Sequence, residues 1–194
     1  MFIASENNER DEIVLWNSFI KGDKDAFSAF YKVFYPKLFA YGLRLRVSEE
    51  YVRDIIQELF LKLYTKPEII KEPETLRAYL FMSFRNACIN HEMYSRKHVD
   101  ISNINTFDLQ FSIENTSIEE EEEKEYTRQK VKEILDDLTP RQREIIYLRF
   151  LHQMEYEEIS RIMNLSGQAA RNLIHRAIDS IRKNNKYSPV VLLP

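Results

Sequence analysis

Side chains that could read DNA recur at helical spacing near the C-terminal end of the chain. Gln168, Asn172 and Arg176 follow one another at intervals of four residues, with Arg171 and His175 beside them. Amide side chains can pair bidentately with adenine, and arginine can do so with guanine. Because residues three or four apart share one face of a helix, we expect these groups on a single outer surface. That surface could contact base edges in the major groove.

A short helix is expected well before these residues. Thr139 can cap its N-terminus, Pro140 suits its first position, and Gln142 stands at the third. This pattern predicts a helix over 141–151, and the apolar spacing predicts a second one over about 156–163.

A tight turn is expected between the second helix and the base-reading helix. Asn164 can adopt a left-handed conformation, Leu165 can fill the core, and Ser166 can cap a final helix from Gly167 to about residue 183. This order is typical of a helix-turn-helix. The alternative is an ordinary helical hairpin with a solvated charged face.

Apolar residues also repeat at helical spacing in several blocks between residues 11 and 95. One block predicts a helix over 51–64, and Ser48 with two glutamates suits its start. Its polar face carries Arg53, Asp54, Gln57, Glu58 and Lys62.

A fourth helix is expected to begin after Pro73, with Glu74 in its first turn, and to run to about residue 96. Its outer face is predicted to carry Arg77, Phe81, Arg85, Asn86, Asn90 and His91. Aromatic and amide groups beside arginines could bind unpaired bases, although aromatic residues at helical spacing are more often core residues.

The composition favours helices throughout. Three glycines and six prolines among 194 residues are too few for a sandwich or barrel with many turns. The net charge is −3, but residues 100–125 carry nine acidic and one basic side chain. This acidic, Asn- and Ser-rich stretch predicts a solvated, flexible linker between two small helical domains. We place the domains at residues 11–99 and 126–186.

Several function classes have no support in the sequence. The single cysteine, Cys88, cannot form an internal disulfide, and no Cys/His cluster has metal-ligand spacing. A phosphate loop and a nucleophile-base pair are absent, so we expect no enzyme, cofactor, metal or small-molecule substrate. No secretion signal or membrane-spanning stretch is evident, which predicts a cytoplasmic protein without membrane insertion.

The two halves together resemble a known family. The segments Leu138–Glu144 and Arg171–Arg182 resemble region 4 of extracytoplasmic-function (ECF) sigma factors, the small bacterial initiation subunits of RNA polymerase. Asp54–Tyr64 resembles the polymerase-binding helix of region 2 in that family, and Tyr79–Phe81 with Asn86 resembles its promoter-melting helix. Tyr79 stands where tryptophan is usual, and Asn90 where aspartate is frequent.

The resemblance implies three sets of contact residues. Contacts with core polymerase would come from Asp54, Gln57, Glu58 and Lys62. Recognition of the minus-10 promoter element would come from Pro67, Arg77, Tyr79, Asn86, Asn90, His91, Arg96 and Lys97. Recognition of the minus-35 element would come from Ser166, Gln168, Arg171, Asn172, His175 and Arg176.

The resemblance further implies promoter-specific transcription initiation, with core polymerase, promoter DNA and an anti-sigma factor as partners. Two alternatives stay open at this point. One is a free-standing helix-turn-helix regulator whose N-terminal domain binds a ligand or dimerises, and the other is a helical adaptor.

Overall fold

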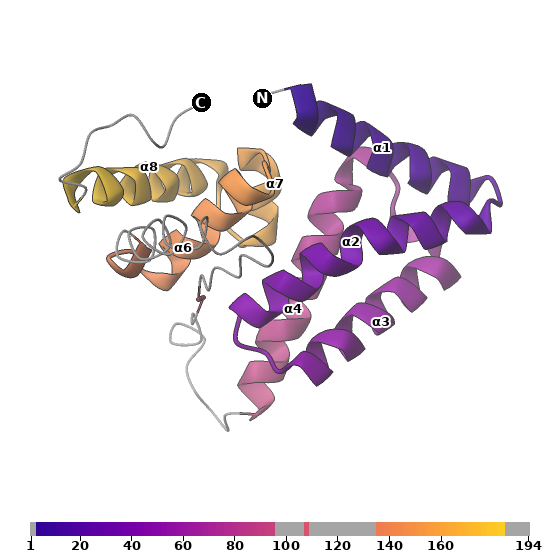
Figure 1. Cartoon of the computed structure of the whole chain (residues 1–194), viewed down its shortest axis with the longest axis horizontal. Coiled ribbons are helices and arrows are strands. Elements are labelled where there is room, and N and C mark those ends of the chain that lie inside the picture. Colours follow the sequence, from indigo (N-terminus) through magenta and orange to yellow (C-terminus); the bar gives the residue numbers. More distant parts are fainter. Residues whose placement is uncertain (1–2, 96–106, 109–134, 185–194) are drawn as a thin grey trace, which may run out of the picture.

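The computed structural model describes residues 3–95, 107–108 and 135–184, and every regular element in these ranges is a helix. The predicted all-α class is therefore confirmed. An N-terminal unit (residues 3–95) contains α1 (Ile3–Ile20), α2 (Lys24–Arg44), α3 (Glu49–Thr65), the 3₁₀ turns η1 (Pro67–Ile69) and η2 (Pro73–Thr75), and α4 (Leu76–Ser95). A C-terminal unit (residues 135–184) contains α6 (Pro140–Ile146), the π-helical turn η4 (Tyr147–Leu151), α7 (Tyr156–Ile162) and α8 (Gly167–Asn184) (Figure 1).

The core of the N-terminal unit is built around α2. Phe30, Phe34, Leu38 and Tyr41 repeat every three or four residues and are completely buried. The next residue, Gly42, lets α3 and α4 approach closely, because a Cβ there would lie 2.6 Å from Val52 Cγ2. This packing fixes the exposed faces of α3 and α4.

The local signals of the helix-turn-helix are confirmed. Thr139 and Gln142 form a reciprocal capping box at the start of α6. Asn164 adopts the left-handed conformation with φ of 51°. Ser166 Oγ accepts a hydrogen bond from the Ala169 amide at 3.1 Å and so caps α8. These short-range hydrogen bonds set the direction of α8 relative to α7.

Two helix boundaries differ from the prediction. The helix expected over 141–151 is α-helical only to Ile146, and then widens into η4, where the His152 amide bonds to the Tyr147 carbonyl at 3.3 Å. The fourth helix begins at Leu76, after the 3₁₀ turn, and the structure describes it to Ser95. Arg96 and Lys97 therefore lie outside the described residues.

The predicted outer face of α4 is wrong at two positions. Phe81 is fully buried and Arg85 is only 9% exposed. Both were assigned to the surface because the pattern of α4 was interpreted for one domain alone. In the structure this side of α4 packs against the C-terminal unit, so these two side chains are buried in the interface between the units.

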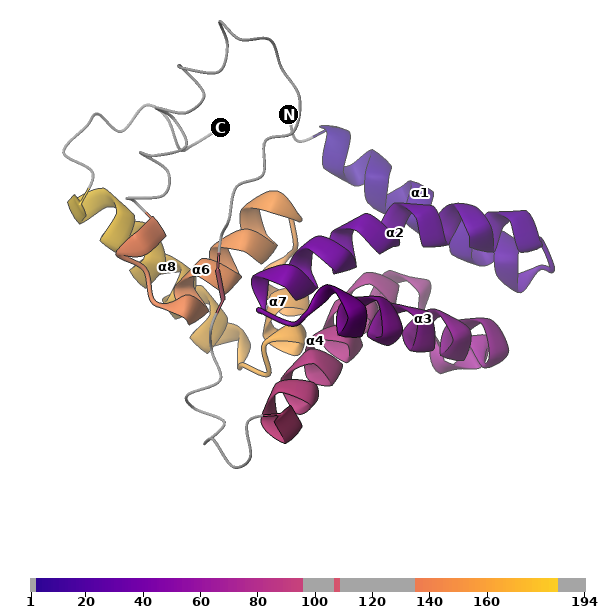
Figure 2. The same ribbon diagram turned by 60° about the horizontal axis from the view of Figure 1, so that its bottom comes forward.

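The two units share an interface along α4 and α7, which lie side by side in Figures 1 and 2. Phe81 of α4 meets His152 edge to face, with ring centroids 4.9 Å apart. Tyr41 of α2 stacks on Tyr147 of η4 at 5.8 Å. The buried residues of both units consequently form one continuous core.

A buried ion pair lies at the centre of this interface. Glu144 of α6 is 0% exposed and accepts from Arg85 Nε at 2.7 Å and from Arg85 Nη2 at 3.1 Å. Tyr41 Oη donates to the same carboxylate at 2.6 Å. Burial raises the pKa of Tyr41 well above its usual value, and the Glu144 carboxylate raises it further, so the phenol stays a donor. Three helices are thereby connected through one carboxylate.

Two residues of the predicted linker also belong to this interface. Phe107 is 1% exposed and packs between Tyr41 and Tyr147, with ring centroids 6.0 and 5.3 Å away. Asp108 pairs with Arg46 at 2.9 Å, and its amide donates to the Arg44 carbonyl at 2.8 Å. The prediction of a solvated linker is therefore wrong for Phe107. Burial of a large aromatic side chain is favourable, and the interface between the two units provides an apolar site for it. The linker residues 100–106 and 109–125 lie outside the described residues.

His152 is held neutral at the interface. Its ring lies against Phe81 and Tyr147. Burial, together with the nearby cations Arg77 of α4 and Lys37 and Arg44 of α2, lowers its pKa from 6.5 to about 3. A charged imidazole would be both desolvated and repelled here.

This environment predicts acid sensitivity. As the pH falls below about 6.5, the unfolded chain takes up a proton at His152 while the folded chain does not, so the contribution of this residue to stability declines toward pH 3. We expect wild type to lose about 2 kcal/mol more unfolding free energy between pH 7 and pH 5 than the His152→Leu variant. Urea denaturation at both pH values measures the difference. Parallel losses in the two proteins would contradict this account of His152.

Candidate functional site

The outer face of α8 carries the predicted base readers. Gln168, Arg171, Asn172, His175 and Arg176 are all exposed. The opposite face of the helix is fixed in the core by the buried residues Ala170, Ile174 and Ala177. The structure therefore brings these five side chains onto one rigid, solvent-facing surface. Ser166, also predicted here, is exposed at the N-terminus of α8 and serves as its cap.

Hydrogen bonds preorganise part of this surface. Gln168 Nε2 donates to Asn172 Oδ1 at 2.9 Å, and Arg176 Nε donates to the Asn172 carbonyl at 3.3 Å. Arg171 pairs with Glu157 of α7 at 3.0 Å and lies over the Tyr156 ring. Because the pair of Arg171 and Glu157 is exposed, exchanging it for a phosphate or a base costs little. Among the hydrogen bonds and ion pairs described, none involves the side chain of His175.

A second exposed polar face lies on α3. Asp54, Gln57, Glu58 and Lys62 are exposed, as predicted, and Asp54, Glu58 and Lys62 follow at intervals of four residues. Val52, Ile56 and Leu63 fix the other side of the helix in the core. Among the described helices, α3 packs mainly against α2 and α4 of its own unit. This acidic and amide-rich face is therefore available to a partner.

Apolar side chains missed by the sequence prediction extend this face. Leu61 is 61% exposed, and Tyr51 and Tyr64 are 47% and 42% exposed. Leu61 lies four residues after Gln57 and three after Glu58, so helical spacing could have placed it on the polar face. An exposed apolar group beside charged side chains is typical of protein interfaces.

The predicted minus-10 residues do not all lie together. Tyr79, Asn86 and Asn90 are spaced seven and four residues apart along one face of α4, where Tyr79 is half-buried and both asparagines are exposed. Pro67 is half-buried at the start of η1, between α3 and α4. His91 is half-buried, and its ring lies 3.6 Å from the centroid of the Tyr51 ring on α3.

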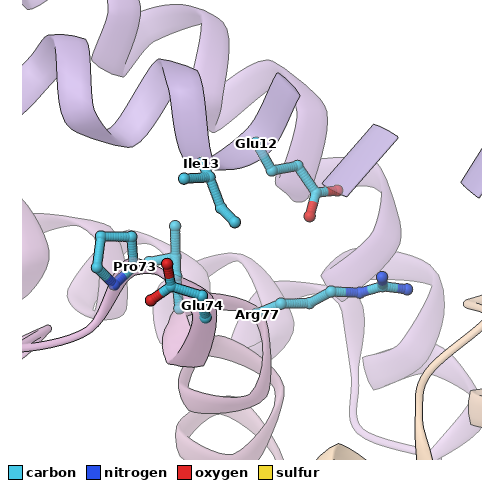
Figure 3. Close-up of a pocket in the computed structure, with 6 residues that line it drawn as sticks. Glu12, Ile13, Pro73, Glu74 and Arg77 are labelled. Carbon is cyan, nitrogen blue, oxygen red and sulfur yellow. The ribbon is translucent and has the colours of Figure 1, made fainter. Parts of the chain in front are cut away.

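Arg77 lies on the other side of α4. It lines a shallow hollow between α1 and η2 with Glu12, Ile13, Pro73, Glu74 and Leu76, and Figure 3 shows its side chain extending away from Pro73 and Glu74. Its charge also acts on His152 of the C-terminal unit. Arg77 is therefore separated from Asn86 and Asn90 in this arrangement.

The described residues contain no group of three or more His, Cys, Asp or Glu side chains that could hold a metal ion. Among the same residues, none of the helices combines the length and apolar character needed to cross a membrane.

Comparison with known proteins identifies both halves. The family described as Sigma-70 region 2 matches residues 30–97, and the family described as Sigma-70, region 4 matches residues 134–183. The chain is 23% identical to the ECF RNA polymerase sigma factor SigM of Bacillus subtilis over 147 residues, which cover 76% of this chain and 87% of SigM. It is 26% identical to the RNA polymerase sigma factor SigV of the same organism over 66% of this chain and 72% of SigV.

A solved structure has a similar fold. The structure of CnrH in complex with the cytosolic domain of CnrY aligns with a TM-score of 0.56 and 18% sequence identity, covering 89% of this chain and 96% of that chain. Both Sigma-70 regions occur here in the order that the sequence resemblance predicted, and the named relatives agree with it. The chain belongs to the ECF subfamily of RNA polymerase sigma factors.

Proposed function

We propose that this sigma factor binds core polymerase through the exposed face of α3 and directs initiation at promoters read by α4 and α8. The observation that carries the proposal is the presence of two separate exposed faces, on α3 and α8, in one chain. The first combines Asp54, Gln57 and Glu58 with Leu61, which suits a protein partner. The second combines amides and arginines on a helix-turn-helix, which suits base edges and phosphates.

Each promoter element is assigned to the residues that suit it. Gln168, Asn172 and Arg176 of α8 would read the minus-35 duplex, together with Arg171 and His175. Tyr79, Asn86 and Asn90 of α4 would hold unstacked bases of the minus-10 element, with Pro67 and His91 nearby. Arg77, Arg96 and Lys97 would add phosphate contacts.

Promoter melting then needs no chemical step. If single-stranded bases bind the minus-10 surface better than paired bases do, binding itself shifts the equilibrium toward the open duplex. Unstacking costs a few kcal/mol per base, which contacts with the protein must offset. We accordingly assign a non-enzymatic role, without cofactor or small-molecule substrate, in the cytoplasm.

An anti-sigma factor is the remaining proposed partner. The related structure of CnrH was solved in complex with the cytosolic domain of CnrY. A free-standing helix-turn-helix regulator is not favoured, since the N-terminal half matches Sigma-70 region 2. The regulator alternative requires tight binding to a palindromic duplex without polymerase, whereas a sigma factor requires core polymerase.

Reconstitution with bacterial core polymerase tests the polymerase-binding proposal. The double variant Asp54→Ala with Glu58→Ala should bind core at least about tenfold more weakly, because it removes two charged contacts, each worth 1 kcal/mol or more when desolvated. Its helical circular dichroism should match wild type, since both side chains are exposed. Promoter-dependent run-off transcripts from genomic fragments should appear with wild type and weaken with the variant.

A matched control removes two exposed acids from elsewhere in the N-terminal unit, as Asp11→Ala with Asp25→Ala. This control should bind core polymerase like wild type. If wild type neither binds core nor yields a promoter-dependent transcript, the proposed function is wrong.

The α8 assignment is tested on a promoter recovered from those transcripts. Gln168→Ala and Arg176→Ala should each lower transcription roughly 5- to 100-fold when the minus-35 element is intact, because each removes base or phosphate contacts worth about 1–3 kcal/mol. The effect should shrink on templates with a scrambled minus-35 element. Asp179→Asn, an exposed substitution on the same helix, should preserve transcription. Equal losses on intact and scrambled templates would exclude minus-35 reading by these residues.

A further inference from the structure

Arg171, one of the proposed base readers, has a carboxylate partner on the neighbouring helix. Its Nη2 atom donates to Glu157 Oε1 at 3.0 Å, and the two side chains come from α8 and α7, which pack against each other. The guanidinium also lies over the Tyr156 ring, with its Cζ atom 5.7 Å from the ring centre. These two contacts hold the guanidinium beside the first turns of α8.

The second arginine on this face has a different environment. Arg176 Nε donates to the Asn172 carbonyl at 3.3 Å, which is an uncharged acceptor. Among the ion pairs of the described residues, none involves the Arg176 guanidinium. Arg176 therefore presents its full positive charge to DNA, whereas the charge of Arg171 is offset by that of Glu157.

The ion pair leaves most of the Arg171 guanidinium available to DNA. A guanidinium carries five N–H donors, and the hydrogen bond to Glu157 uses one donor of Nη2. The side chains of Arg171 and Glu157 are 47% and 63% exposed, so DNA can reach both. The remaining donors are sufficient for a bidentate contact with one base edge while the ion pair persists.

The Glu157 carboxylate makes two kinds of DNA acceptor unequal for Arg171. The O6 and N7 atoms of guanine belong to an uncharged base, whereas a phosphate brings a second negative charge beside the carboxylate. Like charges a few ångströms apart repel each other even near a protein surface. Loss of the hydrogen bond itself costs little, because the pair is exposed, but the carboxylate stays nearby whichever group Arg171 contacts. Arg171 should therefore favour base edges over phosphates.

We propose that Glu157 is a specificity-determining residue, which acts through Arg171 by disfavouring contacts of this arginine with phosphates outside the minus-35 element. The inference rests on the proposed function, because that function assigns α8 to reading DNA. Non-specific binding is electrostatic and grows with the number of phosphates neutralised. An arginine whose charge is offset strengthens binding at the correct sequence more than binding elsewhere. Glu157 is thus a positioning residue, and Arg171 is the group that touches DNA.

The variant Glu157→Gln tests the inference, because it keeps the size of the side chain and one acceptor oxygen but removes the charge. In holoenzyme reconstituted with core polymerase, it should lower the ratio of transcription from intact to scrambled minus-35 templates about threefold. For the full chain without polymerase, affinity for duplex DNA of mixed sequence should rise about three- to fivefold. The slope of log affinity against log salt should steepen by about 0.9, the value for one added phosphate contact. A merely structural role would not raise affinity or steepen this slope.

Three comparison variants separate this effect from net charge and from folding. Asp179→Asn removes one exposed acid from α8 itself, so it matches the change in net charge, and its affinity for mixed-sequence DNA should stay within about twofold of wild type. Glu157→Asp keeps the charge and should restore most of the wild-type template ratio. Adding Arg171→Ala to Glu157→Gln should abolish most of the rise in affinity relative to Arg171→Ala alone, because Glu157 acts through Arg171.

The inference is overturned if wild type transcribes from the promoter but Glu157→Gln leaves the template ratio unchanged; the proposed function would then stand without it. A rise in affinity that is equally large in the Arg171→Ala background would also overturn it. If wild type yields no promoter-dependent transcript, the proposed function fails, and mixed-sequence binding decides separately whether Glu157 restrains Arg171.

Discussion

The arrangement of this sigma factor depends on one buried carboxylate. Glu144 has no exposed surface, and a carboxylate removed from water costs several kcal/mol unless its charge and lone pairs find partners. Arg85 and Tyr41 supply those partners from two different helices of the other unit. Burial alone would lower the pKa of Arg85, but the charge and hydrogen bond of Glu144, together with those of Tyr41, outweigh burial and raise the pKa. Neither charge can be removed without strong destabilisation while the interface stays closed, because the other charge would then be buried and unpaired.

The same interface determines which surfaces of the chain remain exposed to a protein or DNA partner. Aromatic stacking of Tyr41 on Tyr147 and of Phe81 against His152 surrounds the ion pair and excludes water from it. The exposed polar faces of α3 and α8 point away from this contact, whereas Arg77 and Arg85 lie toward it. The proposed polymerase surface on α3 and the base-reading surface on α8 are accordingly exposed in this arrangement, while Arg85 is buried.

Short-range signals in the sequence predicted the elements well. The capping box of Thr139, the left-handed Asn164 and the cap by Ser166 depend on residues within three positions of one another, so their chemistry is visible in the sequence. The exposed readers on α8 followed from helical spacing for the same reason. Arg85 and Phe81 could not be assigned correctly, because their partners Glu144 and His152 lie more than fifty residues away in the chain. Phe107 was missed likewise, since the polar segment around it has no helical period that would mark one of its apolar residues as buried.

A double-mutant cycle at the buried ion pair tests the central claim most directly. Arg85→Met and Glu144→Leu replace the two charges with apolar side chains of similar size, and denaturant unfolding of the full chain measures each free energy. Each single variant should lose about 3–5 kcal/mol, because it strands the other charge in the interface. The double variant should lose less than either single variant, since no buried charge remains unpaired. Losses that simply add would contradict the account, because they would mean that Arg85 and Glu144 do not interact across the interface.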